Sequence, residues 1–115
     1  MAENILADLS TEFAVQILKL TDSIKGHYSL ANQLERSGTS IGANIREAKY
    51  AHGKPDFIAK LQIALKEANE TGYWLELLYK TNYIDEQTYK TLDAACASIR
   101  VMLIASINTS RNKEL

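Results

Sequence analysis

Residues 36–48 read RSGTSIGANIREA, a helical stretch in which one row of side chains is polar and the adjacent row is apolar. The polar row consists of Arg36, Ser40, Asn44 and Glu47, and the apolar row of Leu34, Ile41, Ile45 and Ala48. Because buried polar groups must find hydrogen-bond partners, we expect the polar row to border the core and to fix the register between helices. A ligand groove along this row is the alternative.

Gly38 and Gly42 lie on a third side of the same helix. Each glycine costs about 1 kcal/mol relative to alanine inside a helix, so we expect another helix to approach closely there. This face is a candidate subunit interface. The alternative is that the glycines face a helix of the same chain.

Apolar periodicity and end signals predict four helices. They are expected at residues 10–25, 29–52, 55–81 and 86–109. The residues before the first helix, including Ile5, Leu6 and Leu9, either extend it or lie across a neighbour. Ser10, Ser29 and Asp85 are candidate N-caps, while Gly26 and Gly53 are candidate stops. Four helices joined by short turns predict an all-α, antiparallel, up-down-up-down four-helix bundle that forms one domain over residues 1–115.

The third predicted helix has two surfaces to cover. One apolar face, from Ile58 to Tyr79, suits the bundle core. The second flank comprises Ile63, Glu67, Glu70, Trp74 and Leu78. A symmetric homo-oligomer would cover this flank together with the glycine face.

The composition is that of an ordinary globular protein, with 46% hydrophobic and 23% charged residues. A net charge of -1 argues against binding nucleic acid through bulk charge alone. The single cysteine, Cys96, allows no intrachain disulfide and fits an apolar core position. No uninterrupted apolar run approaches the roughly 18 residues of a membrane span, so we expect no membrane partner and a cytoplasmic location.

Little in the sequence indicates catalysis. Glu67 and Glu70 share a helix face, but neither His27 nor His52 follows a glutamate at the spacing of a di-iron bundle site. Zinc spacings and a glycine-rich phosphate loop are also lacking. We therefore expect no catalytic, cofactor or metal site, and a pairing of the two glutamates with Arg36, Arg46 or a lysine.

The densest basic region contains Arg46, Lys49, Lys54 and Lys60, with Tyr50 close enough to stack on a base. It is a candidate nucleic-acid patch. A solvated rim balanced by nearby glutamates is the favoured interpretation, because the chain is slightly acidic overall.

The opening stretch, as R-S-x-x-S-I-x-x-N-I-x-E, resembles the signature of the 23S rRNA-intervening-sequence protein family of four-helix bundle proteins. Residues 56–70, DFIAKLQIALKEANE, followed by YWLELL at 73–78, resemble the third helix of that family. Two positions depart from the pattern, since Glu35 replaces a basic or apolar residue of many relatives and Ala48 replaces a common glycine.

The resemblance implies an antiparallel bundle that assembles into a ring-shaped homopentamer. It also implies a likeness to accessory proteins of the reverse transcriptase in diversity-generating retroelements, where a basic pentamer binds nucleic acid and the enzyme. We therefore expect a non-enzymatic homo-oligomeric scaffold or interaction module of undefined cellular role. The alternative is an accessory protein that binds RNA or DNA, together with a reverse transcriptase.

Overall fold

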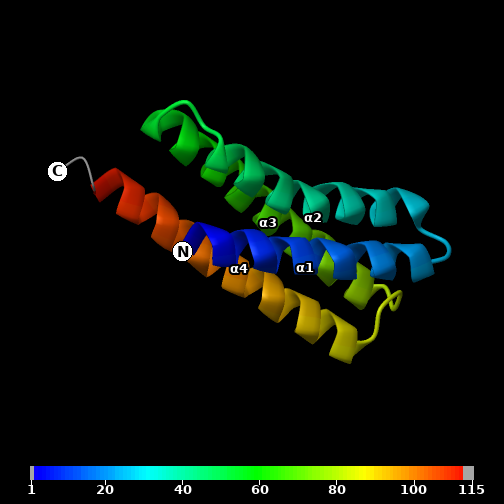
Figure 1. Cartoon of the computed structure of the whole chain (residues 1–115). Coiled ribbons are helices and arrows are strands. Elements are labelled where there is room, and N and C mark those ends of the chain that lie inside the picture. The colour runs from blue at the N-terminus through cyan, green and yellow to red at the C-terminus, as the bar shows by residue number, and fades with distance from the viewer. Residues whose placement is uncertain (1, 113–115) are drawn as a thin grey trace.

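The protein is an antiparallel bundle of four long helices in the computed structural model, which describes residues 2–112 (Figure 1). The helices are α1 (Ala2–Ser23), α2 (Tyr28–Lys49), α3 (Lys54–Lys80) and α4 (Glu86–Asn112). Helices α2 and α3 pack against each other, α1 packs against α2 and α4, and α3 also packs against α4. The predicted all-α four-helix bundle is confirmed.

The first helix begins eight residues earlier than predicted, because burial outweighs the capping signal at Ser10. Leu6 is only 1% exposed and extends the apolar stripe that continues through Phe13 and Ile17. Ser10 is buried inside α1, and its hydroxyl donates to the carbonyl of Ala7 at 3.0 Å. The prediction that Ser10 caps a helix beginning at residue 10 is therefore wrong.

The predicted ends of α2 also need correction. This helix begins at Tyr28 after His27, whose side chain makes no capping hydrogen bond, so Ser29 lies in the first turn rather than at the cap. It ends at Lys49 instead of His52. Gly53 follows with a φ of 113°, which a residue with a side chain rarely adopts.

The ends of α3 and α4 lie closer to their predicted positions. Pro55 occupies the first turn of α3, as predicted. The carboxylate of Asp85 accepts a hydrogen bond from the backbone N–H of Thr88 at 2.7 Å, which confirms the predicted cap of α4. Helix α4 continues to Asn112, three residues beyond the predicted end.

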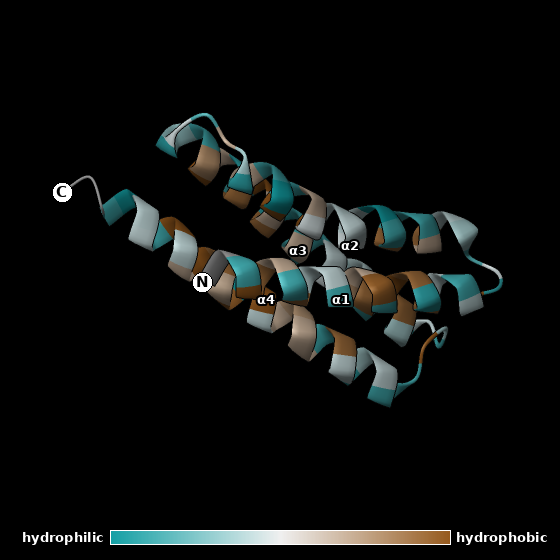
Figure 2. Ribbon diagram, in the orientation of Figure 1, coloured by the Kyte–Doolittle hydropathy of each residue, from teal (hydrophilic) through white to brown (hydrophobic). Residues whose placement is uncertain are grey.

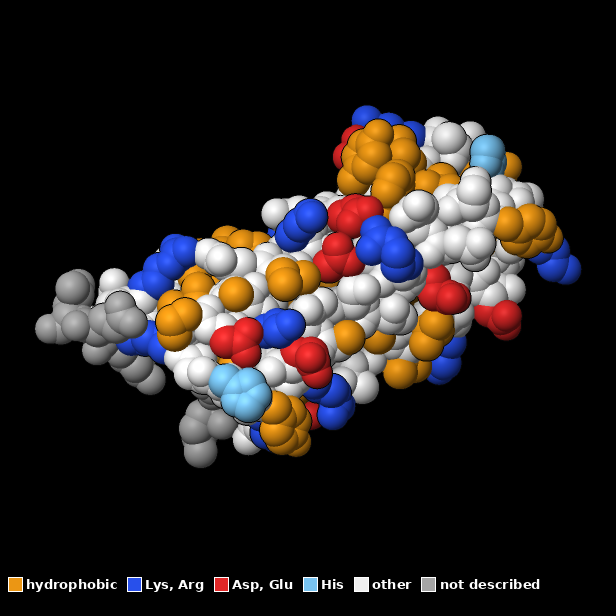
Figure 3. All heavy atoms as spheres, turned by 90° about the horizontal axis from the view of Figure 1, so that it is seen from above, with side chains coloured by type: hydrophobic (Ala, Val, Ile, Leu, Met, Phe, Trp, Pro, Cys, Tyr) orange, Lys and Arg blue, Asp and Glu red, His pale blue; other side chains and the backbone are white. Residues whose placement is uncertain are grey.

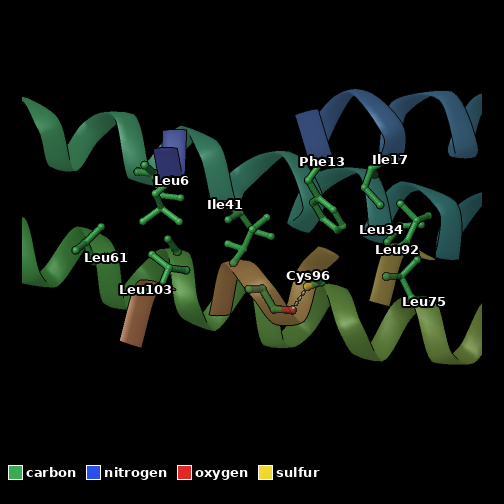
Figure 4. Packing of buried hydrophobic residues seen from close by; sticks show 14 of the residues in the cluster. Leu6, Phe13, Ile17, Leu34, Ile41, Leu61, Leu75, Leu92, Cys96 and Leu103 are labelled. Atoms are coloured by element: carbon green, nitrogen blue, oxygen red, sulfur yellow. Dashed lines mark hydrogen bonds between the residues drawn. The ribbon is translucent and has the colours of Figure 1, made fainter. Parts of the chain in front are cut away.

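The core runs along the bundle axis and receives side chains from all four helices (Figure 4). The predicted apolar row of α2, formed by Leu34, Ile41, Ile45 and Ala48, is at most 4% exposed. Cys96 is buried, and its thiol donates to the carbonyl of Ala68 at 3.3 Å. Burial raises the pKa of this thiol to about 11, so Cys96 serves as a small core residue.

Helix α4 contains a long stretch with few charged residues, and Figure 2 shows much of this helix in white and brown. Among the described residues it is the one helix that could cross a membrane by length and composition. Core helices of soluble proteins pass the same test. One side of α4 is explained by the bundle core, where Leu92, Ile99 and Leu103 are buried.

Candidate functional site

The clearest polar cluster joins α2 to α3. Arg36 donates through Nη1 to Glu67 Oε2 at 2.9 Å and through Nη2 to Glu70 Oε1. The pairing of both glutamates with Arg36 confirms one of the sequence-based alternatives. The hydrogen bond from Arg36 lowers the pKa of Glu70 below its usual value, although burial opposes this shift. Two carboxylates thus share one guanidinium.

Among the described residues, the rest of the predicted polar row makes no hydrogen bond to another helix. Ser40 donates to the carbonyl of Arg36 at 2.7 Å, and the Asn44 amide donates to the carbonyl of Ser40 at 2.9 Å. Glu47 is exposed. Because these bonds satisfy the backbone of α2 itself, only Arg36 performs the predicted role of linking neighbouring helices.

A buried hydroxyl pair that the sequence reasoning missed also links α2 to α3. The hydroxyl oxygens of Ser37 and Thr71 lie 2.9 Å apart, and both residues are fully buried. Each sits in an otherwise apolar row, Ser37 between Leu34 and Ile41. A polar residue at a core position was the signal that could have identified this pair.

The glycine face of α2 is covered within the same chain. A Cβ on Gly38 would lie 3.0 Å from Ile17 Cγ2, and one on Gly42 would lie 3.2 Å from Ser10 Oγ. Helix α1 therefore occupies this face, and the prediction of a subunit interface at Gly38 and Gly42 is wrong. It is also wrong for Leu78, which is completely buried.

Of the other predicted interface residues, Ile63, Glu70 and Trp74 are at least partly exposed, whereas Glu67 is buried. Ile63 is 42% exposed, and Tyr73, further along α3, is 54% exposed. The side chains of Glu67 and Glu70 are 11% and 29% exposed. We define the α2–α3 face by Arg36, Ile63, Glu70, Tyr73 and Trp74. Figure 3 shows acidic and basic side chains together in the middle of the view from above, next to hydrophobic ones.

Trp74 adds a polar group to this face. Its ring centroid lies 5.2 Å from that of Tyr73. Within residues 4–112, the buried Nε1 of Trp74 has no hydrogen-bond partner, although the indole contributes to the lowered pKa of Glu70. The indole N–H is therefore close to that carboxylate without a well-formed hydrogen bond.

The candidate nucleic-acid residues lie at the end of the bundle where α2 meets α3. Arg46 and Lys49 line a pocket of about 60 Å³ whose wall includes Tyr50 and Phe57. Arg46 also donates to Thr11 Oγ1 at 3.3 Å. Lys54 and Lys60, which are half-buried on α3, do not line this pocket. Of the four residues, Arg46 and Lys49 share this pocket.

Metal-binding groups are dispersed over the bundle. In the part of the chain that the structure describes, no group of three or more His, Cys, Asp or Glu residues could hold a metal ion. His27 packs edge-on against Tyr83 with ring centroids 5.2 Å apart. His52 is exposed, and its backbone N–H donates to the Asp56 carboxylate at 3.2 Å.

Comparisons with known proteins agree with the fold. The model of the 23S rRNA-intervening sequence protein family matches residues 2–105. No curated protein matches the chain. A crystal structure from Bacteroides thetaiotaomicron VPI-5482, described as a protein with unknown function from the S23 ribosomal protein family, is 48% identical with a TM-score of 0.89. The match covers 94% of this chain and 99% of that chain. The chain therefore belongs to the 23S rRNA-intervening sequence protein family, whose function is unknown.

Proposed function

We propose that this protein is a non-enzymatic homo-oligomeric scaffold or interaction module in the cytoplasm. The family resemblance favours a ring of five copies. The observation that supports the proposal best is the α2–α3 face, which combines apolar side chains with the ion pairs of Arg36. A second copy of the chain is the proposed occupant.

The chemistry of this face suits a protein interface. Tyrosine, tryptophan and arginine are enriched where proteins meet, and the energetically important residues cluster at the centre of the contact. Ile63 and Tyr73 present apolar surface beside the Arg36 cluster. Covering the cluster would exclude water and strengthen its electrostatic interactions, because the local dielectric constant would fall.

The size of the bundle permits such an assembly. A standard interface buries about 800 Å² on each partner, and a member of a ring makes two interfaces. About 1,600 Å² would then be covered out of a total accessible surface of 6849 Å². Most of the surface would remain available for other partners.

Sedimentation of two matched variants tests the proposal. Ile63→Glu places a charge on the α2–α3 face, whereas Val15→Glu makes a similar change on α1 at a residue that is 45% exposed. We expect Ile63→Glu to dissociate the oligomer and Val15→Glu to leave it intact. The proposal is contradicted if the wild-type protein is a monomer at micromolar concentration. It is also contradicted if both variants sediment as the wild-type oligomer does.

Nucleic-acid binding is a second candidate, supported by the shared pocket of Arg46 and Lys49 beside Tyr50, which is 76% exposed. We expect replacement of both basic residues by alanine to weaken binding of a labelled single-stranded RNA and to reduce its salt dependence. The control replaces Lys25 and Lys80 at the opposite end of the bundle. Equal effects of the two double variants would refute a specific patch.

A further inference from the structure

Arg100 is a half-buried cation without a carboxylate partner in the described part of the chain. It is the only charged residue between Asp93 and Arg111 on α4. Its Nη1 lies 3.8 Å from Cys96 Sγ, and a Cβ on Gly72 would lie 3.3 Å from the same nitrogen. A guanidinium in this position would gain from an anion that another molecule supplies.

Exposed apolar side chains follow Arg100 along α4. Val101 and Ile104 are 67% and 46% exposed, which is unusual for large aliphatic residues on a helix that also supplies the core. We define the α4 face by Ala97, Arg100, Val101 and Ile104. An apolar surface with one central arginine has the composition of the buried part of an interface.

The complementary charge lies on the α2–α3 face of the same chain. There the single cation Arg36 is shared by two carboxylates, Glu67 and Glu70. The Glu70 side chain is the more accessible acceptor, with 29% of its surface exposed against 11% for Glu67. One face therefore has two carboxylates for one guanidinium, and the other has a guanidinium with no carboxylate partner among the described residues.

We propose that the α4 face of one copy docks on the α2–α3 face of the next, so that Arg100 binds Glu70 of the neighbouring copy. This inference rests on the proposed homo-oligomeric function and assigns its interface. The two faces are different, so the contact is head-to-tail, and repetition closes into a ring when the geometry allows. Helix α3 lies between α2 and α4 in the bundle, so the two faces point in clearly different directions, which favours a ring over two-fold pairing.

Charge reversal and mixing test this pairing. We expect Arg100→Glu and Glu70→Arg each to raise the dissociation constant at least about tenfold, since each leaves like charges opposed across the contact. Mixing the two variants should give mixed dimers, because the unchanged Glu70 of the first variant meets the unchanged Arg100 of the second. A five-membered ring cannot alternate the two chains throughout, so the readout is the mixed dimer and not the closed ring. Arg111→Glu, the same change at an exposed site near the end of α4, should assemble as wild type.

The outcomes separate this inference from the proposed function. A monomeric wild-type protein overturns both. If the wild type is oligomeric and the Arg100→Glu variant assembles equally well, only the pairing is overturned. The α4 face would then be left for another partner. Folded variants that stay dissociated when mixed also overturn it. If circular dichroism shows that Arg100→Glu is unfolded, Arg100→Gln replaces it, and retained assembly of that variant overturns the pairing.

Discussion

Two glycine-to-alanine substitutions should have opposite effects on stability, because one glycine touches the core and the other touches only a flexible side chain. Alanine gains about 1 kcal/mol over glycine inside a helix. At Gly38 the added methyl would meet Ile17 at 3.0 and 3.1 Å, and Ile17 is fully buried. At Gly72 the one close atom from the described residues is Nη1 of Arg100 at 3.3 Å, which can move.

Overpacking a core costs about 1 to 3 kcal/mol, so Gly38→Ala should lose about 1 kcal/mol after the helical gain is included. Gly72→Ala should gain up to about 1 kcal/mol. Urea denaturation measures both free energies of unfolding. The Ile63→Glu background is the appropriate host, since assembly would otherwise contribute to the measured stability. Equal stabilisation by the two substitutions would refute the close approach of α1 to Gly38.

Three further predictions concern single groups in the bundle. Ser37→Ala or Thr71→Ala alone should cost about 0.5 to 1.5 kcal/mol by removing the hydrogen bond between the helices, because the remaining hydroxyl keeps its bond to a carbonyl of its own helix. A double-mutant cycle should show coupling between the two sites, and additive losses would contradict the hydrogen bond. The pKa of Glu70 is lowered by Arg36, so its stabilisation is complete above about pH 4.5 and is lost as the pH falls through the folded pKa. Glu70→Gln should therefore lose less stability on acidification than wild type, as measured by thermal unfolding, and an unchanged loss would exclude this ion pair as a cause. Cys96 should react with a thiol reagent at pH 8 only after urea unfolds the chain, because its pKa is about 11, and rapid reaction of the folded protein would contradict its burial.

The bundle itself could be predicted from the sequence because the three- and four-residue spacing of apolar residues is repeated along each helix. Apolar spacing placed the buried row of α2 correctly, and the cap at Asp85 followed from local chemistry. Ser10 misled the prediction because a serine that favours an N-cap is also small enough to lie opposite Gly42 in a tight helix contact. The tertiary contact prevailed over the local preference.

The candidate site was less predictable. Helical periodicity shows which residues share one face of a helix, but it does not show which other helix or subunit packs on that face. The polar row on α2 and the glutamates on α3 were each visible, and Arg36 joins them. The glycine face could have met α1, α3 or another subunit, and only the packed structure shows Ile17 and Ser10 against it. For the same reason, the half-buried position of Arg100 beside Gly72 and Cys96 was not apparent from its sequence neighbours.

Assembly is the central claim, and native mass spectrometry of the wild-type protein at micromolar concentration tests it most directly. The account predicts a single main species with several times the 12.9 kDa mass of one chain, and five copies if the family resemblance extends to stoichiometry. A species of 12.9 kDa at every concentration would contradict the claim.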